Sequence, residues 1–267
     1  YTTIEVYMNI EQLADKLISW IKEQVSHSGC KGVVLGMSGG IDSSVLAVLC
    51  HHAFPQSTLG VLMPCYSNQG DMEHARAVAA KFSIPTQTVV LDSVLNTLLK
   101  ALPSNEVDPD VSRLAEANLK ARLRMLTLYY FANRLGYMVA GSSNRSELSI
   151  GYFTKYGDGG CDLLPLGGLY KTQVWEIARC LGVPECIITK PPSADLWMDQ
   201  FDENEIGVSY WTLDQVLYLL VDKKMSVDAV AKKGWGLKTV QKIARMTESS
   251  RHKRSTPPLP KCNRFLK

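Results

Sequence analysis

The sequence lacks the features that mark several common classes of protein. Its seven cysteines are odd in number and scattered, and none forms a CxxC pair, which argues against a disulfide framework and a zinc site. No apolar run approaches the roughly 20 residues that a membrane-spanning helix needs. The N-terminus also lacks the basic and then apolar order of a signal peptide. We therefore expect reduced thiols, no membrane association and a cytoplasmic location.

A strong charge of one sign is also absent. The formal net charge is +3 and the isoelectric point is about 8.4. Sequence-independent nucleic-acid binding requires a dense basic stripe, so we expect no nucleic-acid partner, although this charge suffices for a phosphate-rich small ligand. Apolar residues make up 46% and charged residues 21% of the 267 positions, which is typical of a folded chain with one large domain.

Apolar β-branched runs alternate with amphipathic patterns in the first half of the sequence. The spacing predicts helices over 9–26, 42–50, 72–82 and 111–135, and short strands over 31–37, 58–63, 86–91 and 137–141. Strands that alternate with helices form parallel sheets, because each crossover connection carries a helix. We therefore predict an α/β fold with a doubly wound, mostly parallel sheet and helices on both of its faces.

The second half of the sequence is less regular. Residues 150–168 are glycine-rich with little periodicity, which favours a functional loop over an ordinary connection. Helices are expected over 170–181, 212–222 and 237–251, so the C-terminal region should be helical. Residues 255–267 contain proline and basic side chains, and either a loosely held tail or a docked segment fits them.

A turn rich in glycine and serine follows the strand predicted over 31–37. It consists of Gly36, Met37, Ser38, Gly39, Gly40, Ile41, Asp42 and Ser43. Glycines allow a positive φ and a close approach to an anion, and the start of the next helix presents unpaired N–H groups. No lysine follows the last glycine, so this is not a Walker A loop, and it is not a GxGxxG fingerprint. We predict that the turn binds phosphate groups.

Asp42 in this turn indicates a metal ion. A carboxylate beside bound phosphates would be repelled unless a cation lay between them, so the position predicts Mg²⁺. The alternative is an aspartate that only adds favourable charge to the first turn of a helix.

Several stretches carry a resemblance to a known family. Residues 38–44, SGGIDSS, resemble the pyrophosphate-binding loop of the N-type ATP pyrophosphatases, which split ATP between its α and β phosphates while adenylating an oxygen. Residues 141–147 (GSSNRSE) and 151–165 (GYFTKYGDGGCDLLP) closely resemble the signature of the NAD synthetases within that group. The likeness continues at 169–171, 191–196, 202–207 and 252–254. The chain is thus similar to ammonia-dependent NAD synthetases over most of its length.

The resemblance implies a fold and a reaction. The fold would be Rossmann-like, of the adenine nucleotide alpha hydrolase type, with residues 1–267 forming a single synthetase domain and no glutaminase domain. The enzyme would be a Mg²⁺-dependent ligase that converts ATP, deamido-NAD and ammonia into AMP, diphosphate and NAD through a deamido-NAD adenylate. The resemblance also implies a homodimer.

The resemblance further assigns roles in binding ATP and the metal. Asp42 and Glu147 match the Mg²⁺ ligands, which suits an ion that prefers hard oxygen donors. Lys171 matches a lysine that binds the ATP phosphates, and a solvated lysine at a helix start is the alternative. Ser142 and Ser193 match positions that contact ATP together with residues 36–43.

Deamido-NAD is expected to contact a second set of residues: Arg122, Lys155, Asp162, His252 and Lys253. Arg124 is a close rival of Arg122, because either guanidinium would suit the pyrophosphate of the dinucleotide. A solvated helix end is the alternative for His252 and Lys253. By the same analogy, Asp158 lies near the reacting centre and is a candidate to bind ammonium and accept its proton. Asp42, Lys171 and Asp158 are therefore the predicted catalytic residues.

Two other functions compete with this interpretation. A different ATP pyrophosphatase, such as a tRNA-thiolating enzyme, is disfavoured by the absence of CxxC pairs and of a strongly basic composition. A non-catalytic nucleotide-binding regulator on the same fold would have no need for Asp42, Glu147 and Lys171 together. Their joint presence favours an enzyme.

Overall fold

A four-stranded parallel sheet lies at the centre of the computed structural model, which describes residues 9–103, 108–193, 197 and 200–260. The strands are β1 (Val33–Gly36), β2 (Thr58–Leu62), β3 (Thr86–Thr88) and β4 (Met138–Ala140). Their order is β3-β2-β1-β4, and the central strand β1 pairs Val34 with Leu59 of β2 and with Val139 of β4. All pairings are parallel, as the alternating pattern predicts.

Helices connect the strands and form the C-terminal region. They are α1 (Ile10–His27), α2 (Ile41–Ala53), α3 (Gln69–Phe82), α4 (Asp92–Ala101), α5 (Pro109–Leu135), α6 (Arg145–Ile150), α7 (Lys171–Cys180), α8 (Glu185–Ile188), α9 (Asp202–Ile206), α10 (Tyr210–Leu217), the π-helix η1 (Tyr218–Asp222), α11 (Val227–Ala231), α12 (Leu237–Ser249) and the 3-10 turn η2 (Arg251–Lys253).

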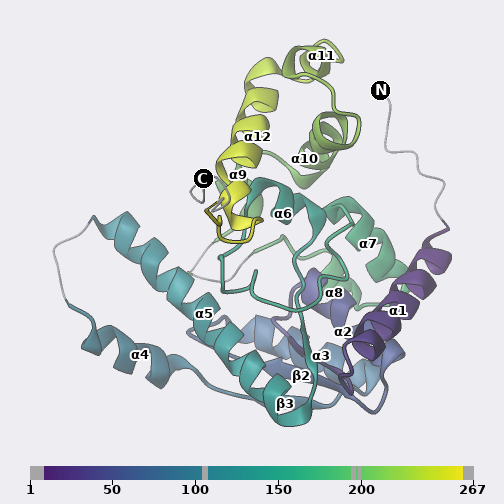
Figure 1. Cartoon of the computed structure of the whole chain (residues 1–267), viewed down its shortest axis with the longest axis vertical. Helices are drawn as coiled ribbons and strands as arrows, with labels where there is room; N and C mark the ends of the chain where they lie inside the picture. The colour runs from purple at the N-terminus through teal and green to yellow at the C-terminus, as the bar shows by residue number, and fades with distance from the viewer. Residues whose placement is uncertain (1–8, 104–107, 194–196, 198–199, 261–267) are drawn as a thin grey trace, which may run out of the picture.

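The sheet has a hydrophobic core on each face. On one face, Leu35 and Leu62 pack with buried residues of α1, α2, α3 and α7. On the other face, Val34, Val61 and Val139 pack against α4 and α5 (Figure 1). Successive side chains of a strand point to opposite faces, so apolar runs such as Val33–Leu35 serve both cores. The predicted doubly wound α/β fold is confirmed.

The C-terminal helices form a third cluster above the sheet region (Figure 1). α10 and α12 bury Tyr210, Leu213, Val240 and Ile243 in this cluster, together with Ile150 at the end of α6 and Tyr170 just before α7. Contacts of α10 with both α6 and α7 join the C-terminal helices to the elements that follow β4. This arrangement positions side chains of α10 near the carboxyl ends of the strands.

The structure adds elements that the sequence patterns did not predict. The unpredicted helices are α4, α6, α8, α9 and α11, none longer than α4. The polar turn expected after β4 continues directly into α6. The glycine-rich segment over 150–168 is an irregular loop, as expected, and it touches the sheet through a bridge between Ala140 and Leu163. In the part of the chain that the structure describes, no helix has the length and apolarity needed to cross a membrane.

Candidate active site

The predicted phosphate-binding turn and the start of α6 lie beside each other at the carboxyl ends of β1 and β4. These two strands are neighbours in the sheet, and β2 and β3 lie on the other side of β1. The chain therefore leaves the sheet in different directions after β1 and after β4. Such a topological switch point is where open α/β sheets bind their ligands.

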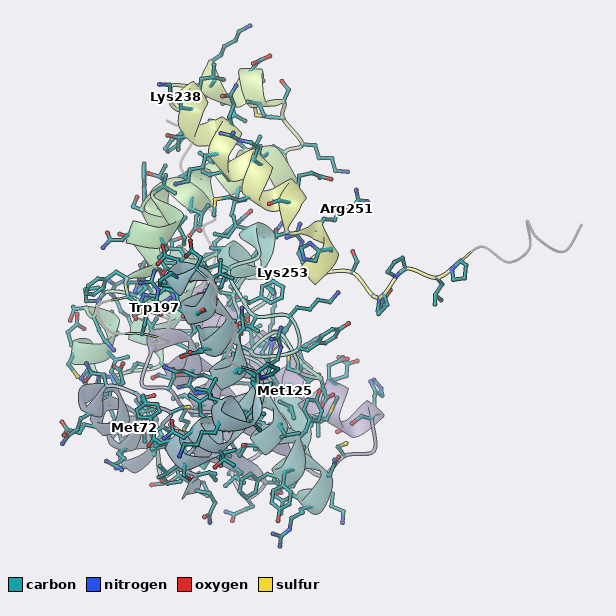
Figure 2. All side chains as sticks on the ribbon, turned by 90° about the vertical axis from the view of Figure 1, so that its left-hand side faces the viewer. Met72, Met125, Trp197, Lys238, Arg251 and Lys253 are labelled. Carbon is teal, nitrogen blue, oxygen red and sulfur yellow. The ribbon has the colours of Figure 1, made fainter. Side chains whose placement is uncertain are left out.

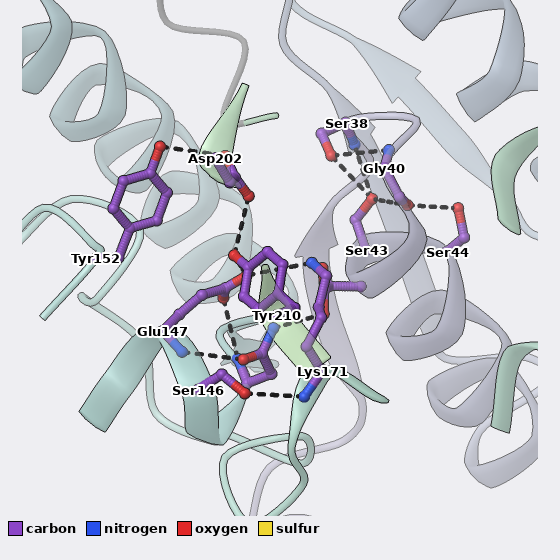
Figure 3. Close-up of polar contacts among 12 residues, drawn as sticks. Ser38, Gly40, Ser43, Ser44, Ser146, Glu147, Tyr152, Lys171, Asp202 and Tyr210 are labelled. Atoms are coloured by element: carbon purple, nitrogen blue, oxygen red, sulfur yellow. Dashed lines mark hydrogen bonds and ion pairs between the residues drawn. The ribbon is translucent and has the colours of Figure 1, made fainter. Parts of the chain in front are cut away.

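The turn between β1 and α2 is held in shape by its own hydroxyl groups (Figure 3). Ser43 Oγ lies 2.9 Å from Ser38 Oγ and donates to the Gly40 carbonyl at 3.0 Å. Gly39 has a φ of +82°, and a Cβ atom there would lie 2.0 Å from the Asp71 carbonyl oxygen. Only glycine fits this position, because it combines a left-handed conformation with a close backbone approach. The turn leads into the N-terminus of α2, where backbone N–H groups favour an anion.

Lys171 lies at the centre of the candidate site. Its ammonium group forms ion pairs with Asp42 and with Glu147 Oε1, the latter at 3.3 Å (Figure 3). Asp42 belongs to the first turn of α2, Glu147 to α6 and Lys171 to the start of α7. Lys171 is 2% exposed, which rules out the alternative of a solvated lysine. Three helices that are distant in sequence thus bring one cation and two carboxylates together.

A capping box orients Glu147. The Asn144 side chain accepts a hydrogen bond from the Glu147 backbone N–H at 3.1 Å, and the Glu147 carboxylate accepts one from the Asn144 N–H at 3.2 Å. Asn144 Nδ2 also donates to Asp42 Oδ1 at 2.9 Å. This motif satisfies the free N–H groups at the start of α6 and fixes the glutamate rotamer. Asn144 therefore links the two predicted metal ligands.

Negative charge exceeds positive charge around Lys171. Burial alone would lower the pKa of Lys171, but the carboxylates of Asp42, Glu147 and Asp202 outweigh it, so that pKa is raised above its ordinary value. Burial raises the pKa of Glu147; Lys171 opposes this shift, and Asp42 and Asp202 add to it. A further cation at Glu147 would favour its ionised form. The electrostatics therefore suit a bound metal ion.

The fit to Mg²⁺ depends on two carboxylates. Among the described residues, no three His, Cys, Asp or Glu side chains are arranged to hold a metal ion. Mg²⁺ is commonly bound by one or two carboxylates together with substrate phosphates and water. Asp42 and Glu147 face the same ammonium group next to the phosphate-binding turn, so they fit such a mode.

Two tyrosines and an aspartate extend the site toward the C-terminal helices. The Tyr210 ring lies under the Lys171 ammonium, 5.0 Å from it, and its hydroxyl donates to Asp202 Oδ2 at 3.0 Å. The Tyr152 hydroxyl donates to Asp202 Oδ1 at 3.1 Å. Burial raises the pKa of Asp202. Neither Tyr210 nor Asp202 was predicted to belong to the site. Asp202 lies in the stretch 202–207 that carries the family likeness, but no role was assigned to it, and Tyr210 lies just before the helix predicted over 212–222.

The candidate dinucleotide residues gather where the glycine-rich loop meets α5 and the C-terminal turn. Arg122 Nη2 donates to the Lys155 carbonyl at 3.3 Å, and Lys155 Nζ donates to the His252 carbonyl at 2.9 Å. Arg124 points elsewhere, to the Met63 carbonyl at 3.2 Å beyond β2. The structure thus brings Arg122, Lys155 and His252 together and leaves Arg124 apart.

Lys253 fastens the C-terminal turn to the loop. It follows α12 at the end opposite Lys238 (Figure 2). Its ammonium donates to the carbonyls of Gly151 and Phe153 at 2.7 and 2.8 Å. Burial lowers the pKa of Lys253. This lysine is therefore held by the loop, whereas His252 is exposed and its ring bonds only the Ser249 carbonyl, at 3.0 Å, among the contacts that the structure gives it.

Asp158 and Asp162 have their carboxylates engaged by backbone groups. Asp158 Oδ1 accepts from the Thr154 N–H at 2.8 Å within the glycine-rich loop. Asp162 accepts from the Val139 N–H and the Tyr129 hydroxyl, both at 2.8 Å, so it ties the loop to β4 and α5. Neither carboxylate belongs to the Lys171 cluster. The catalytic role of Asp158 and the dinucleotide contact of Asp162 remain predictions.

The two candidate ATP serines are Ser142, between Asp42 and Glu147 in the chain, and Ser193, after Lys171. Ser142 lies between β4 and α6, two residues before Asn144, and is half-buried. Ser193 is half-buried after the Pro191-Pro192 pair. The remainder of that motif, residues 194–196, lies outside the described residues. The ATP contacts of both serines remain predictions.

The sequence is similar to those of known NAD synthetases. Residues 13–257 match the family described as NAD synthase. A relative from Carboxydothermus hydrogenoformans, named NH(3)-dependent NAD(+) synthetase, is 45% identical over 253 residues, 95% of this chain and 98% of its own length.

Two solved structures have a similar fold. An NMN synthetase from Francisella tularensis has a TM-score of 0.84 at 31% identity, with 95% of this chain and 99% of that chain covered. An NH3-dependent NAD synthetase from Campylobacter jejuni has a TM-score of 0.79 at 28% identity, with 95% and 100% covered. The match to the family over most of the chain and the close relative show that this chain belongs to the NAD synthase family.

Proposed function

We propose that this protein is an ammonia-dependent NAD synthetase, which uses ATP to convert the carboxylate of deamido-NAD into the amide of NAD. The observation that carries the proposal is the convergence of Asp42, Glu147 and Lys171 beside a glycine turn at the switch point of the sheet. The relative of 45% identity bears the corresponding name. We further propose that the chain acts as one synthetase domain.

The reaction needs activation because a carboxylate is a poor electrophile. In the first step, a carboxylate oxygen of deamido-NAD bonds to the α-phosphorus of ATP, and the bond to the β-phosphate oxygen breaks, so that pyrophosphate leaves. Lys171 is the buried charge available to stabilise negative charge on that leaving group. The N–H groups and hydroxyls of residues 38–43 would hold the pyrophosphate.

Asp42 and Glu147 would hold a Mg²⁺ ion, which supplies positive charge to the phosphate oxygens. The ion pair between Lys171 and Asp42 orders this side of the site before nucleotide binds. Asn144 keeps both carboxylates turned toward the same point through its contacts with each.

In the second step, ammonia attacks the adenylated carbonyl carbon and AMP leaves, which yields the amide and releases a proton. Water must be kept out, since it would return the adenylate to deamido-NAD. The loop over 150–168 and the turn at 251–253 are candidates for that cover, because Lys155 and Lys253 already join them. Asp158 remains our candidate for binding ammonium and accepting its proton.

A homodimer is part of the proposal. α5 exposes four large apolar side chains, Val111 and Leu114 near its start and Leu126 and Tyr130 farther along, which solvent does not favour. Sedimentation of the purified protein at micromolar concentration tests this association. Replacement of Leu126 by Glu should shift a dimer toward monomer.

The assay for the proposed function measures NAD, AMP and pyrophosphate together after incubation with ATP, Mg²⁺, deamido-NAD and ammonium. Equimolar formation of all three, dependent on deamido-NAD, is the expected result. Lys171→Gln should abolish it, and Lys16→Gln on the exposed face of α1 is the matched control. Cleavage of ATP to AMP without NAD would move the assignment to another ATP pyrophosphatase, and no cleavage would favour a nucleotide-binding regulator.

The same assay separates two acid substrates. The likeness to the Francisella tularensis NMN synthetase makes nicotinic acid mononucleotide a second candidate. Parallel reactions with the mononucleotide and the dinucleotide give two values of kcat/KM. A higher value for deamido-NAD supports the proposal, and a higher value for the mononucleotide replaces it with NMN synthesis.

A further inference from the structure

A buried aspartate on α10 connects the two helices that carry the site. Asp214 is 0% exposed, and its carboxylate accepts from Ser146 Oγ at 2.5 Å and from the Thr172 backbone N–H at 2.9 Å. Ser146 Oγ in turn accepts from the Lys171 backbone N–H at 2.9 Å (Figure 3). Ser146 precedes Glu147 on α6, and Thr172 follows Lys171 on α7.

These contacts satisfy the start of α7. The first N–H groups of a helix have no partner inside the helix and must be satisfied by other groups when they are buried. At α7 the first two, from Lys171 and Thr172, are bonded by Ser146 and Asp214. A negative charge at this end is also favoured by the helix dipole. Asp214 therefore fixes both the backbone and the direction of the residue that carries the ammonium group.

The same carboxylate sets the spacing of α6 and α7. The Ser146 hydroxyl has one proton, which it donates to Asp214, and it uses a lone pair for the Lys171 N–H. Because Ser146 and Lys171 are joined in this way, Glu147 Oε1 comes to lie 3.3 Å from Lys171 Nζ. Tyr210 lies one turn before Asp214 on α10 and touches the Lys171 side chain. α10 thus contacts Lys171 in two ways. Asp214 reaches the Lys171 backbone N–H through Ser146, and the Tyr210 ring packs against the Lys171 ammonium group.

We propose that Asp214 is a positioning residue for the reaction, which holds Lys171 and Glu147 at their working separation through Ser146 and Thr172. The proposal rests on the proposed synthetase function. Asp214 is fully buried and bonds Ser146 and Thr172, so its effect passes through Lys171. Groups that orient catalytic side chains commonly contribute about 10- to 100-fold to activity.

The test compares Asp214→Asn with Ser146→Ala. Asparagine keeps the volume but offers one acceptor where the carboxylate offers two, so its N–H₂ group must face either the Ser146 hydroxyl or the Thr172 N–H, and the network around the Lys171 N–H is disturbed. Ser146→Ala removes only the bridging hydroxyl and leaves Asp214 on Thr172. Asp228→Asn is the matched control, because Asp228 occupies the exposed first turn of α11.

We expect each of the two variants to lower kcat for AMP and NAD formation by about 10- to 100-fold, with KM for deamido-NAD within about twofold. The Mg²⁺ concentration for half-maximal rate should rise, since Glu147 shifts as well. The double variant should be no slower than the slower single variant, because both act through one link. Circular dichroism and thermal unfolding must show that the variants are folded at the assay temperature.

Three results would overturn the proposal. One is wild-type kcat in folded Asp214→Asn, and another is a loss of activity that only follows the unfolded fraction. The third comes from crystal structures without ligands: an unchanged separation of Lys171 Nζ and Glu147 Oε1 in both variants contradicts positioning. That structural comparison is independent of turnover. If the wild-type protein forms no NAD, the synthetase proposal fails while the crystal structures still decide the role of Asp214.

Discussion

The ammonium group of Lys171 lies 5.0 Å from the centre of the Tyr210 ring. An aromatic ring presents its negative face to a cation, so this contact favours the charged lysine without adding another carboxylate to an already acidic site. The Tyr210 hydroxyl is directed to Asp202 and lies 3.5 Å from Glu147 Oε1. The Tyr210 ring therefore contacts the ammonium group of Lys171, whereas the Tyr210 hydroxyl contacts the carboxylates of Asp202 and Glu147.

Tyr210→Phe and Tyr210→Leu should separate these two contributions. Phenylalanine keeps the ring, so we expect kcat within about threefold of wild type. Leucine removes the ring and should lower kcat by up to about tenfold, since a desolvated cation–π contact is worth about 1–2 kcal/mol. Steady-state AMP formation measures both, with the folded fraction checked by unfolding. Equal losses in the two variants would assign the effect to the hydroxyl.

Glu147→Gln should remove the metal function and leave α6 intact. Glutamine can replace glutamate in a capping box, because its side-chain oxygen also accepts from the Asn144 N–H. The variant loses the ionised ligand, so we expect at least about a 100-fold loss of AMP formation and a weaker response to Mg²⁺. Glu11→Gln in the exposed first turn of α1 is the control. Full activity of folded Glu147→Gln would exclude Glu147 as a ligand.

Gly39→Ala should impair both nucleotide binding and folding. Its Cβ atom would meet the Asp71 carbonyl at 2.0 Å, and the backbone φ is +82°. Gly29 has a φ of +74° with nothing within 4 Å of a Cβ atom, so Gly29→Ala imposes similar strain without the clash. Each should lose about 1–2 kcal/mol of stability to strain, and Gly39→Ala should lose more, because the Asp71 backbone must also shift. Only Gly39→Ala should raise KM for ATP, by about tenfold or more, and an unchanged KM would contradict the role of this turn.

The fold could be predicted because its signals are local. Val33–Leu35 is apolar on both sides of the strand, and the glycine turn follows it directly, so β1, the turn and α2 are visible in one short stretch. α6 was missed because six residues span less than two helical turns and show no period. Its capping box, Asn144 with Glu147, was the signal that could have revealed it.

The chemistry of the turn alone predicted Asp42, whereas Glu147 and Lys171 were predicted only through the family resemblance. The resemblance named Asp42, Glu147 and Lys171, and the structure brings them together. Tyr210 and Asp214 could not be found in this way, because their contacts with Lys171 and Ser146 join residues far apart in sequence. In the sequence, α10 shows only the spacing of a core helix.

Arg122 should contribute to dinucleotide binding, and Arg124 should contribute to the stability of the fold. Arg122 is exposed and its guanidinium bonds the loop at the Lys155 carbonyl, so it lies where a dinucleotide could reach it. Arg124 is half-buried and bonds the Met63 carbonyl and Ser67 Oγ. We expect Arg122→Gln to raise KM for deamido-NAD about tenfold or more, as the loss of a charged hydrogen bond predicts.

Arg124→Gln should instead lower the free energy of unfolding by about 1–3 kcal/mol, because it leaves a buried carbonyl without its donor. Its KM for deamido-NAD should stay within about twofold of wild type. Steady-state kinetics gives KM for deamido-NAD, and urea unfolding gives the free energy of unfolding, for both variants. The reverse pattern would give the dinucleotide contact to Arg124.

The pH dependence of stability should carry the signature of Asp214. Burial raises the pKa of this carboxyl group from 3.8 to about 6, with hydrogen bonds from Ser146 and Thr172 opposing the shift. Between these pH values the carboxyl group has lost its proton in the unfolded chain and keeps it in the native state. Its contribution to the free energy of unfolding therefore falls as pH rises toward 6. The asparagine side chain of Asp214→Asn does not titrate, so the stability of wild type relative to this variant should fall by up to about 3 kcal/mol over that range. Urea unfolding of both proteins from about pH 4 to about pH 7 measures the difference, and a constant difference would mean that the native pKa of Asp214 is not raised.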